Sequence, residues 1–228
     1  MKLKNKKLIL FDLDGTLVDS VPDLLRGING MLSELGRDGF SQDDIRGWVG
    51  NGALVLVKRA LSGSSTVDDG IDEALSAKAL DIFLKHYAQN LSVDSRLYPN
   101  VKGTLLSLKD RGYRLAIVTN KPYRFVEPLL SGFGINRLFD ISVGGDSLSI
   151  KKPDPMMLEY VCKKLDIDID NTVIVGDSKN DIFPANQIGM QSIGVTYGYN
   201  YDEDISVYSP SYVVDDFGDI LALLPDRR

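Results

Sequence analysis

Short apolar runs alternate with helical patterns along most of this 228-residue chain, and this alternation constrains the fold more than any other feature. Each run is only a few residues long, as expected of strands that are buried on both faces. Strands that alternate with helices predict an α/β fold, in which helices cover both sides of a parallel sheet. The predicted strands are residues 8–11, 115–118, 141–143, 172–175, 192–195 and 212–214, and the helices between the later strands are residues 101–111, 124–133, 155–165 and 181–188.

The segment from residue 22 to residue 91 interrupts the alternation, because it shows helical patterns and no convincing strand. We therefore predict an inserted α-helical domain at residues 20–93 and an α/β core made of residues 1–19 and 94–228. The helices predicted in the insertion are a first one that stops at Gly36, a short one after the N-cap residue Ser41, one from Ala53, and one from Ile71 to about Leu91.

The charge balance is acidic, with 26 Lys and Arg against 32 Asp and Glu and a net charge of −6. Such a surface repels nucleic acid and anionic lipid, so neither is an expected partner. Cys162 is the only cysteine, which excludes an intrachain disulfide and suits a reducing compartment. The apolar runs are too short for a signal-peptide core or for the ~18 residues of a membrane span. We expect a cytoplasmic protein that is a monomer or a weak homodimer.

The strongest local signal is the stretch Asp-Leu-Asp-Gly-Thr at residues 12–16, directly after the first predicted strand. Side chains alternate along a strand, so Asp12 and Asp14 point the same way at its carboxyl end, where α/β sheets bind their ligands. Two carboxylates there repel each other unless a cation or a substrate compensates. The alternatives are a surface turn and a calcium loop, but Leu17 stands where a calcium loop requires glycine.

Polar residues follow other predicted strands in the same way. Thr119 and Asn120 end one strand and offer a hydroxyl and backbone N–H groups that suit phosphate oxygens. Lys152 precedes a Pro-Asp-Pro segment, whose stiff prolines fix where its ammonium points. Asp177 and Asp181 follow a later strand about one helical turn apart. Taken singly, Lys152 could be an ordinary solvated lysine, and the two aspartates could be helix caps. The carboxyl ends of parallel strands meet at one edge of a sheet, however, so together these residues predict an active site.

The motif set Asp12-x-Asp14-x-Thr16, Thr119, Lys152 and Gly176-Asp177-x-x-x-Asp181 resembles that of the haloacid dehalogenase superfamily of phosphotransferases. The resemblance implies a Rossmann-like parallel core with strand order 3-2-1-4-5 and makes the helical insertion a mobile cap. It also implies a bound Mg²⁺, with carboxylates from Asp12 and Asp177, a backbone carbonyl from Asp14, and Asp181 acting through a water. Within the superfamily, the stretches 48–53 and 119–122 resemble those of bacterial phosphoglycolate phosphatases, which implies 2-phosphoglycolate as substrate.

The chemistry of phosphate monoesters suits these residues. Hydrolysis needs barrier reductions above ~20 kcal/mol, and a carboxylate nucleophile such as Asp12 divides the reaction into two easier steps through an aspartyl phosphate. We expect Mg²⁺ to offset the electrostatic repulsion between that carboxylate and the phosphate dianion. Lys152 and Thr119 then orient the phosphoryl oxygens, and Asp14 serves as general acid and base.

Substrate selection is assigned to residues around the leaving group. Gly50-Asn51-Gly52 precedes a predicted helix. The two glycines let the backbone approach a ligand closely, and the free N–H groups at the start of the helix suit an anion. The alternative is that the glycines only form a tight turn between two helices. Thr16, Asn120 and Lys121 complete the predicted substrate-binding set, and Arg46 is a further candidate cation.

Other functions remain open at this stage. A phosphosugar mutase related to β-phosphoglucomutase, or a phosphatase for another small metabolite, would use the same core. A receiver that signals through a phosphorylated aspartate is disfavoured by the chain length and by the turn at Asp14. His86, the only histidine, and Cys162 are interpreted as packing residues rather than catalysts.

Overall fold

A six-stranded parallel sheet forms the centre of the computed structural model, which describes residues 3–201 and 203–227. The strands are β1 (Leu8–Phe11), β4 (Arg114–Val118), β5 (Ile141–Val143), β6 (Thr172–Gly176), β7 (Gln191–Val195) and β8 (Tyr212–Val214). Their order in the sheet is β5-β4-β1-β6-β7-β8, which confirms the predicted order and adds β8 beside the fifth strand.

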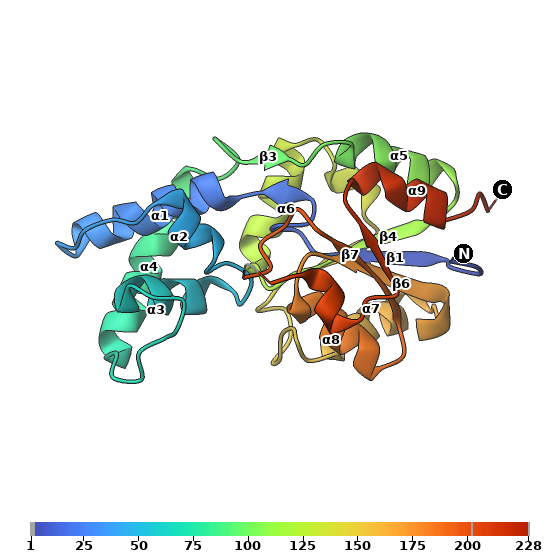
Figure 1. Ribbon diagram of the computed structural model, residues 1–228. Helices are drawn as coiled ribbons and strands as arrows, with labels where there is room; N and C mark the ends of the chain where they lie inside the picture. The colour runs from blue at the N-terminus through green and yellow to red at the C-terminus, as the bar shows by residue number, and fades with distance from the viewer. Residues whose placement is uncertain (1–2, 202, 228) are drawn as a thin grey trace.

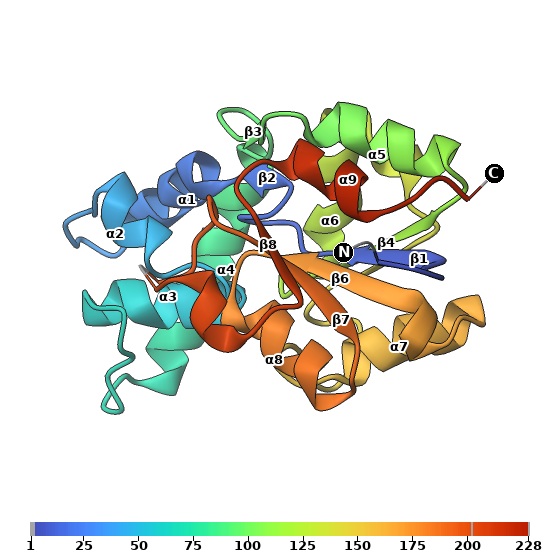
Figure 2. The ribbon, with the colours of Figure 1, turned by 45° about the vertical axis from the view of Figure 1, so that its right-hand side comes forward.

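Helices cover both faces of this sheet, as Figures 1 and 2 show. The strand β1 illustrates why: Ile9 and Phe11 belong to one apolar cluster, whereas Leu8 and Leu10 belong to another on the opposite face. The first cluster receives α5 (Val101–Asp110), α6 (Tyr123–Gly132) and α9 (Ile220–Leu223), and the second receives α7 (Met156–Leu165) and α8 (Lys179–Gln187).

Residues between β1 and α5 build a separate helical layer with its own apolar cluster (Figure 1). Ser41 caps the second helix in a reciprocal arrangement with Asp44, and glycine in the left-handed region ends the third helix at Gly63. The fourth helix begins at Glu73, two residues later than predicted, because Asp72 is its N-cap. The layer consists of α1 (Val21–Glu34), α2 (Gln42–Arg46), α3 (Ala53–Ser62) and α4 (Glu73–Gln89).

Two very short antiparallel strands, β2 (Val18–Asp19) and β3 (Arg96–Leu97), lie where the chain passes between the sheet and the helical layer. Asp23, fully buried in α1, accepts hydrogen bonds from the backbone N–H groups of Asp94 and Ser95 at 2.9 Å. The two connections are thereby tied to each other. Short 3₁₀ helices complete the described chain: Asn136–Leu138, Ile169–Asn171, Ile205–Tyr208 and Phe217–Asp219.

None of the helices in the described part of the chain has the length and apolar run that a bilayer span requires.

Candidate active site

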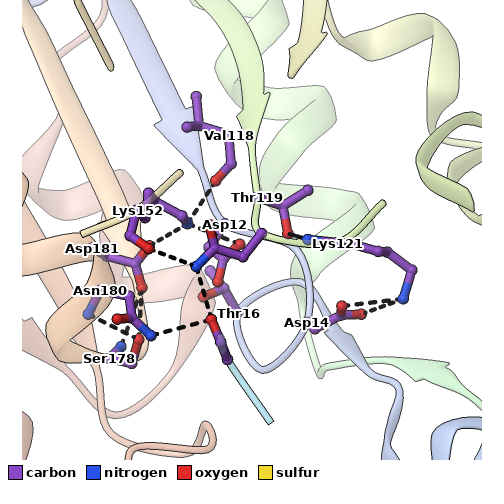
Figure 3. A network of polar contacts seen from close by, with 12 residues as sticks. Asp12, Asp14, Thr16, Val118, Thr119, Lys121, Lys152, Ser178, Asn180 and Asp181 are labelled. Carbon is purple, nitrogen blue, oxygen red and sulfur yellow. Dashed lines mark hydrogen bonds and ion pairs between the residues drawn. The ribbon is translucent and has the colours of Figure 1, made fainter. Parts of the chain in front are cut away.

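Asp12, Lys152 and Asp181, which follow different strands, meet at the carboxyl end of β1 (Figure 3). The Lys152 ammonium lies at their centre, 3.1 Å from Asp12 Oδ1 and 2.6 Å from Asp181 Oδ1, and it donates to the carbonyl of Val118 at 2.7 Å. Burial alone lowers the pKa of Lys152, but the two carboxylates outweigh that effect and raise it. Lys152 is therefore a permanent buried cation beside Asp12.

Asp12, Asp177 and Asp181 form a buried carboxylate cluster in which one oxygen of each lies within 4.8 Å of the others. Burial, opposed by Lys152 and reinforced by Asp181, raises the pKa of Asp12 to about 6. Burial and then the charge of Asp12 raise the pKa of Asp177 well above its usual value. Three carboxylates facing a single ammonium fit a divalent cation, since Mg²⁺ prefers oxygen ligands and offsets such repulsion.

Local structure fixes the outer two carboxylates. Asp177 accepts hydrogen bonds from the Thr16 hydroxyl at 2.8 Å and from the backbone N–H of Tyr199 at 2.7 Å. Gly15 and Gly198 make that approach possible, because a Cβ on either would overlap the Asp177 side chain. Asp181 also caps the first turn of α8 through a capping box with Ser178. It is therefore both a helix-capping residue and a member of the carboxylate cluster.

A second group of polar side chains lies on the other side of Asp12 (Figure 3). The Lys121 ammonium contacts both carboxylate oxygens of Asp14 at 3.0 and 3.1 Å, and it donates to the Tyr87 hydroxyl of α4 at 2.6 Å. Burial lowers the pKa of Lys121, but Asp14 and then Tyr87 more than compensate and hold it above the usual range. Lys121 is thus a second buried cation.

A cavity of about 40 Å³ separates the sheet from the helical layer next to these groups. Gly50 and Gly52 border it in left-handed conformations, with φ of +123° and +88°, and α3 begins at the adjacent Ala53. The Gly50 carbonyl accepts hydrogen bonds from the side-chain amides of Asn120 at 2.9 Å and Asn180 at 3.2 Å. The cavity is lined by Asp12, Asp14, Leu24, Val49, Gly50, Gly52, Ala53, Leu56, Phe83, Tyr87, Thr119, Asn120, Lys121, Pro122 and Phe125.

Comparison with known proteins agrees with this geometry. The family model described as haloacid dehalogenase-like hydrolase matches residues 9–195, which include every strand-end residue described above. The chain belongs to the haloacid dehalogenase-like hydrolase family. It is therefore an enzyme of the hydrolase class, as the sequence motifs predicted.

Several proteins of similar sequence are named phosphoglycolate phosphatase. A phosphoglycolate phosphatase of Colwellia psychrerythraea is 52% identical over 98% of this chain and 99% of that protein. A phosphoglycolate phosphatase of Vibrio cholerae is 45% identical over 97% of this chain and 98% of that protein. A crystal structure described as a predicted phosphoglycolate phosphatase from Haemophilus somnus has a TM-score of 0.89 and 43% identity, covering 96% of this chain and 98% of that one. The predicted resemblance to the family, and within it to phosphoglycolate phosphatases, is confirmed.

Some residues of this haloacid dehalogenase-like hydrolase lie where the motifs alone did not place them. Thr16 is completely buried behind Asp177, so it positions that carboxylate instead of lining the cavity. The Asn51 side chain bonds to Tyr201 at 2.8 Å, away from the cavity, and Arg46 pairs with Asp19 at 3.2 Å. His86 lies on α4, and its Nε2 is 2.7 Å from a carboxylate oxygen of Glu34.

Three residues of the site carried no sequence signal that we recognised. Tyr87 belongs to a helical pattern like that of any core aromatic, and Tyr199 follows β7 without a motif. Asn180 lies inside the stretch 176–181, but only its neighbours belong to the family pattern. Its polar amide, between Asp177 and Asp181 in the sequence, is the one feature that could have indicated a role in the site.

Proposed function

We propose that this chain is a phosphomonoester hydrolase that acts through an aspartyl phosphate on Asp12 and uses Mg²⁺. The placement of Asp12 carries the proposal: its buried Oδ1 lies 3.1 Å from the Lys152 ammonium and next to the carboxylates of Asp177 and Asp181. A carboxylate oxygen beside a fixed cation suits attack on a phosphoryl group, whose oxygens the cation attracts.

The residues for the metal are the carboxylates of Asp12 and Asp177 and the backbone carbonyl of Asp14, with Asp181 acting through a water. When bound, Mg²⁺ supplies positive charge that reduces repulsion between the nucleophile and the phosphate dianion. Asp181 takes the outer position that the family resemblance implies, and its two oxygens accept hydrogen bonds from Lys152 and Ser178.

The reaction divides between two carboxylates. An Asp12 oxygen forms a bond to phosphorus while the ester P–O bond breaks, and Asp14 gives its proton to the departing alkoxide. Asp14 then takes a proton from a water whose oxygen attacks phosphorus, and the Asp12–phosphorus bond breaks to release inorganic phosphate. Lys152 and the Thr119 hydroxyl hold the phosphoryl oxygens during both steps.

We propose 2-phosphoglycolate as the substrate. The small cavity favours a compact leaving group, and Lys121, Asn120, Gly50 and Gly52 border it, with the start of α3 next to them. The similar proteins named phosphoglycolate phosphatase support the same choice. In this proposal residues 20–93 act as a mobile cap on a core of residues 1–19 and 94–228, of which residues 1–2, 202 and 228 lie outside the described chain. We further propose a cytoplasmic monomer or weak homodimer.

Phosphate release from a panel of phosphorylated metabolites tests the function. We expect 2-phosphoglycolate to be hydrolysed fastest with Mg²⁺, EDTA to stop the reaction, and Ca²⁺ to support little turnover because its looser coordination misplaces the reacting groups. Full activity after rigorous chelation would contradict the metal assignment. Phosphoryl transfer between two hydroxyls of a sugar without phosphate release would favour the mutase, and a long-lived aspartyl phosphate would favour the receiver.

A further inference from the structure

Tyr87 is a buried side chain of the helical layer that reaches the residues of the sheet. Its hydroxyl accepts a hydrogen bond from Lys121 Nζ at 2.6 Å, while its ring lies 4.6 Å from the same nitrogen. The ring stacks on Phe83 with centroids 5.6 Å apart and meets Phe125 edge-on at 5.1 Å. Gly27 of α1 packs against this stack so closely that a Cβ there would lie 3.0 Å from Phe83. Packing therefore fixes the position of the Tyr87 hydroxyl.

Lys121 is the only basic residue among the described residues that line the cavity. Its side chain is 2% exposed, and apolar side chains such as Leu24 and Leu56 form much of the surrounding wall. An ammonium in such surroundings attracts an anion strongly, because little water competes for it. Asp14 supplies that anion here, with both oxygens in contact.

The two buried cations lie on opposite sides of the nucleophile. Figure 3 shows Lys152 on one side of Asp12 and Lys121 with Asp14 on the other. Lys152 faces the carboxylate cluster, where the phosphoryl group is proposed to react, so Lys121 is left to the alcohol part of the ester. This arrangement suits a molecule with two anionic ends joined by a short link.

We propose that Tyr87 is a specificity-determining residue: it holds the Lys121 ammonium at the cavity wall, and that ammonium selects esters whose alcohol part carries a carboxylate. The inference rests on the proposed function, because it concerns the choice among phosphate esters. Tyr87 acts through Lys121 and is thus a positioning residue rather than a catalytic one. A merely structural role, or a role limited to orienting Asp14, would affect all esters alike.

The test compares two esters that differ only where Lys121 is expected to act. 2-Phosphoglycolate carries a carboxylate where ethyl phosphate carries a methyl group. For Tyr87→Phe we expect kcat/KM for 2-phosphoglycolate to fall about tenfold, mainly through KM, as for loss of one hydrogen bond to a charged group. The value for ethyl phosphate should stay within about twofold, because its methyl group makes no such contact. The ratio of the two values within one enzyme does not depend on how much of the variant is folded.

Tyr160→Phe, which removes a hydroxyl from α7, is the matched control and should leave the ratio unchanged. An equal loss on both esters in Tyr87→Phe, or no loss on either, would overturn the inference and leave the phosphatase assignment intact. Hydrolysis of neither ester by the wild-type enzyme would instead overturn the proposed function itself.

Discussion

The two sides of Asp12 are built differently. On the sheet side, Lys152 lies in the loop after β5, Asp177 directly follows β6, and Asp181 lies in the first turn of α8. Backbone groups and a helix cap fix these side chains. On the helix side, Lys121 is held by Tyr87 of α4, and the Gly50 carbonyl is held by side-chain amides of the core. Strand register thus determines the first side, whereas the contacts of Tyr87 and Gly50 on the second side require the helical layer to lie against the sheet.

This difference suggests that the two sides of Asp12 act on different parts of the substrate. The sheet side contains the groups that any phosphate ester requires, and the contacts described for it involve no residue of the helical layer. The helix side meets the part of the substrate that varies. Changes on the sheet side should therefore reduce activity on every ester, and changes on the helix side should reduce it unequally.

Asp12→Asn should have the largest effect. The variant keeps the shape of the side chain but loses the nucleophile, so we expect turnover of every ester to fall below detection. Phosphate release with purified protein measures this, and Asp110→Asn at the exposed end of α5 is the matched control. Multiple turnover by Asp12→Asn, free of contaminating enzyme, would contradict a covalent mechanism.

Asp14→Asn should reduce kcat by at least about 10²-fold, the lower range for general acid–base catalysis. The loss of kcat/KM, which reports formation of the aspartyl phosphate, should be smaller for an aryl phosphate, because an aryl leaving group departs with little need for a proton. Steady-state kinetics on both esters measures the difference. Wild-type rates in this variant would assign the proton transfers to another group.

Gly52→Ala should act on the helix side with a smaller effect. Gly52 has φ of +88°, and its Cβ would lie 3.0 Å from the Asn120 carbonyl, so the loop must move away from the sheet. The strain of about 1–2 kcal/mol corresponds to about a tenfold loss of kcat/KM for 2-phosphoglycolate, with slow aryl phosphate hydrolysis retained.

Gly112→Ala is the matched control, since Gly112 has φ of +83° with open space around it. It carries similar backbone strain far from the cavity and should leave activity unchanged. An equal loss on both esters in Gly52→Ala would show that the loop only supports the fold, as the tight-turn interpretation holds.

The smallest effect concerns stability without metal. The pKa of Asp12 is raised to about 6 in the folded protein, so folding favours its protonated form. The metal-free protein should therefore lose stability as the pH rises from about 4 to about 6. Asp12→Asn lacks this loss and should be more stable than wild type at pH 8 in EDTA, by up to about 3 kcal/mol.

Thermal unfolding at several pH values measures this difference, which should amount to several degrees for a chain of this length. Below pH 4 the two proteins should unfold at similar temperatures. A less stable Asp12→Asn at pH 8 would mean that pairing with Lys152 outweighs the burial of the charge.

Sequence patterns predicted the sheet well, because a buried parallel strand requires a continuous apolar run and few other structures do. Each predicted strand agrees with the structure to within one residue at either end. The meeting of Asp12, Lys152 and Asp177 was also predictable, since parallel strands bring their carboxyl ends to one edge.

The remaining features depend on contacts between distant segments. The strands β2 and β3 contain two residues each, too few to show any periodicity. Tyr87 and Tyr199 resemble ordinary core aromatics in the sequence, and only the packing of α4 and of the segment after β7 gives their polar groups partners. Thr16 matched a motif, but its position behind Asp177 follows from the turn at Gly15.

Mass spectrometry of the Asp14→Asn variant tests the central claim most directly. This variant keeps the nucleophile but lacks the group proposed to activate water, so the aspartyl phosphate should accumulate when Mg²⁺ and an aryl phosphate are added, since the aryl leaving group needs little protonation. After acid quenching and digestion, the account predicts the mass of one phosphoryl group on the peptide that contains Asp12, and none when Asp12→Asn is added to the variant. Turnover by the wild-type enzyme with no phosphorylated peptide in Asp14→Asn, or with the label on another residue, would contradict it.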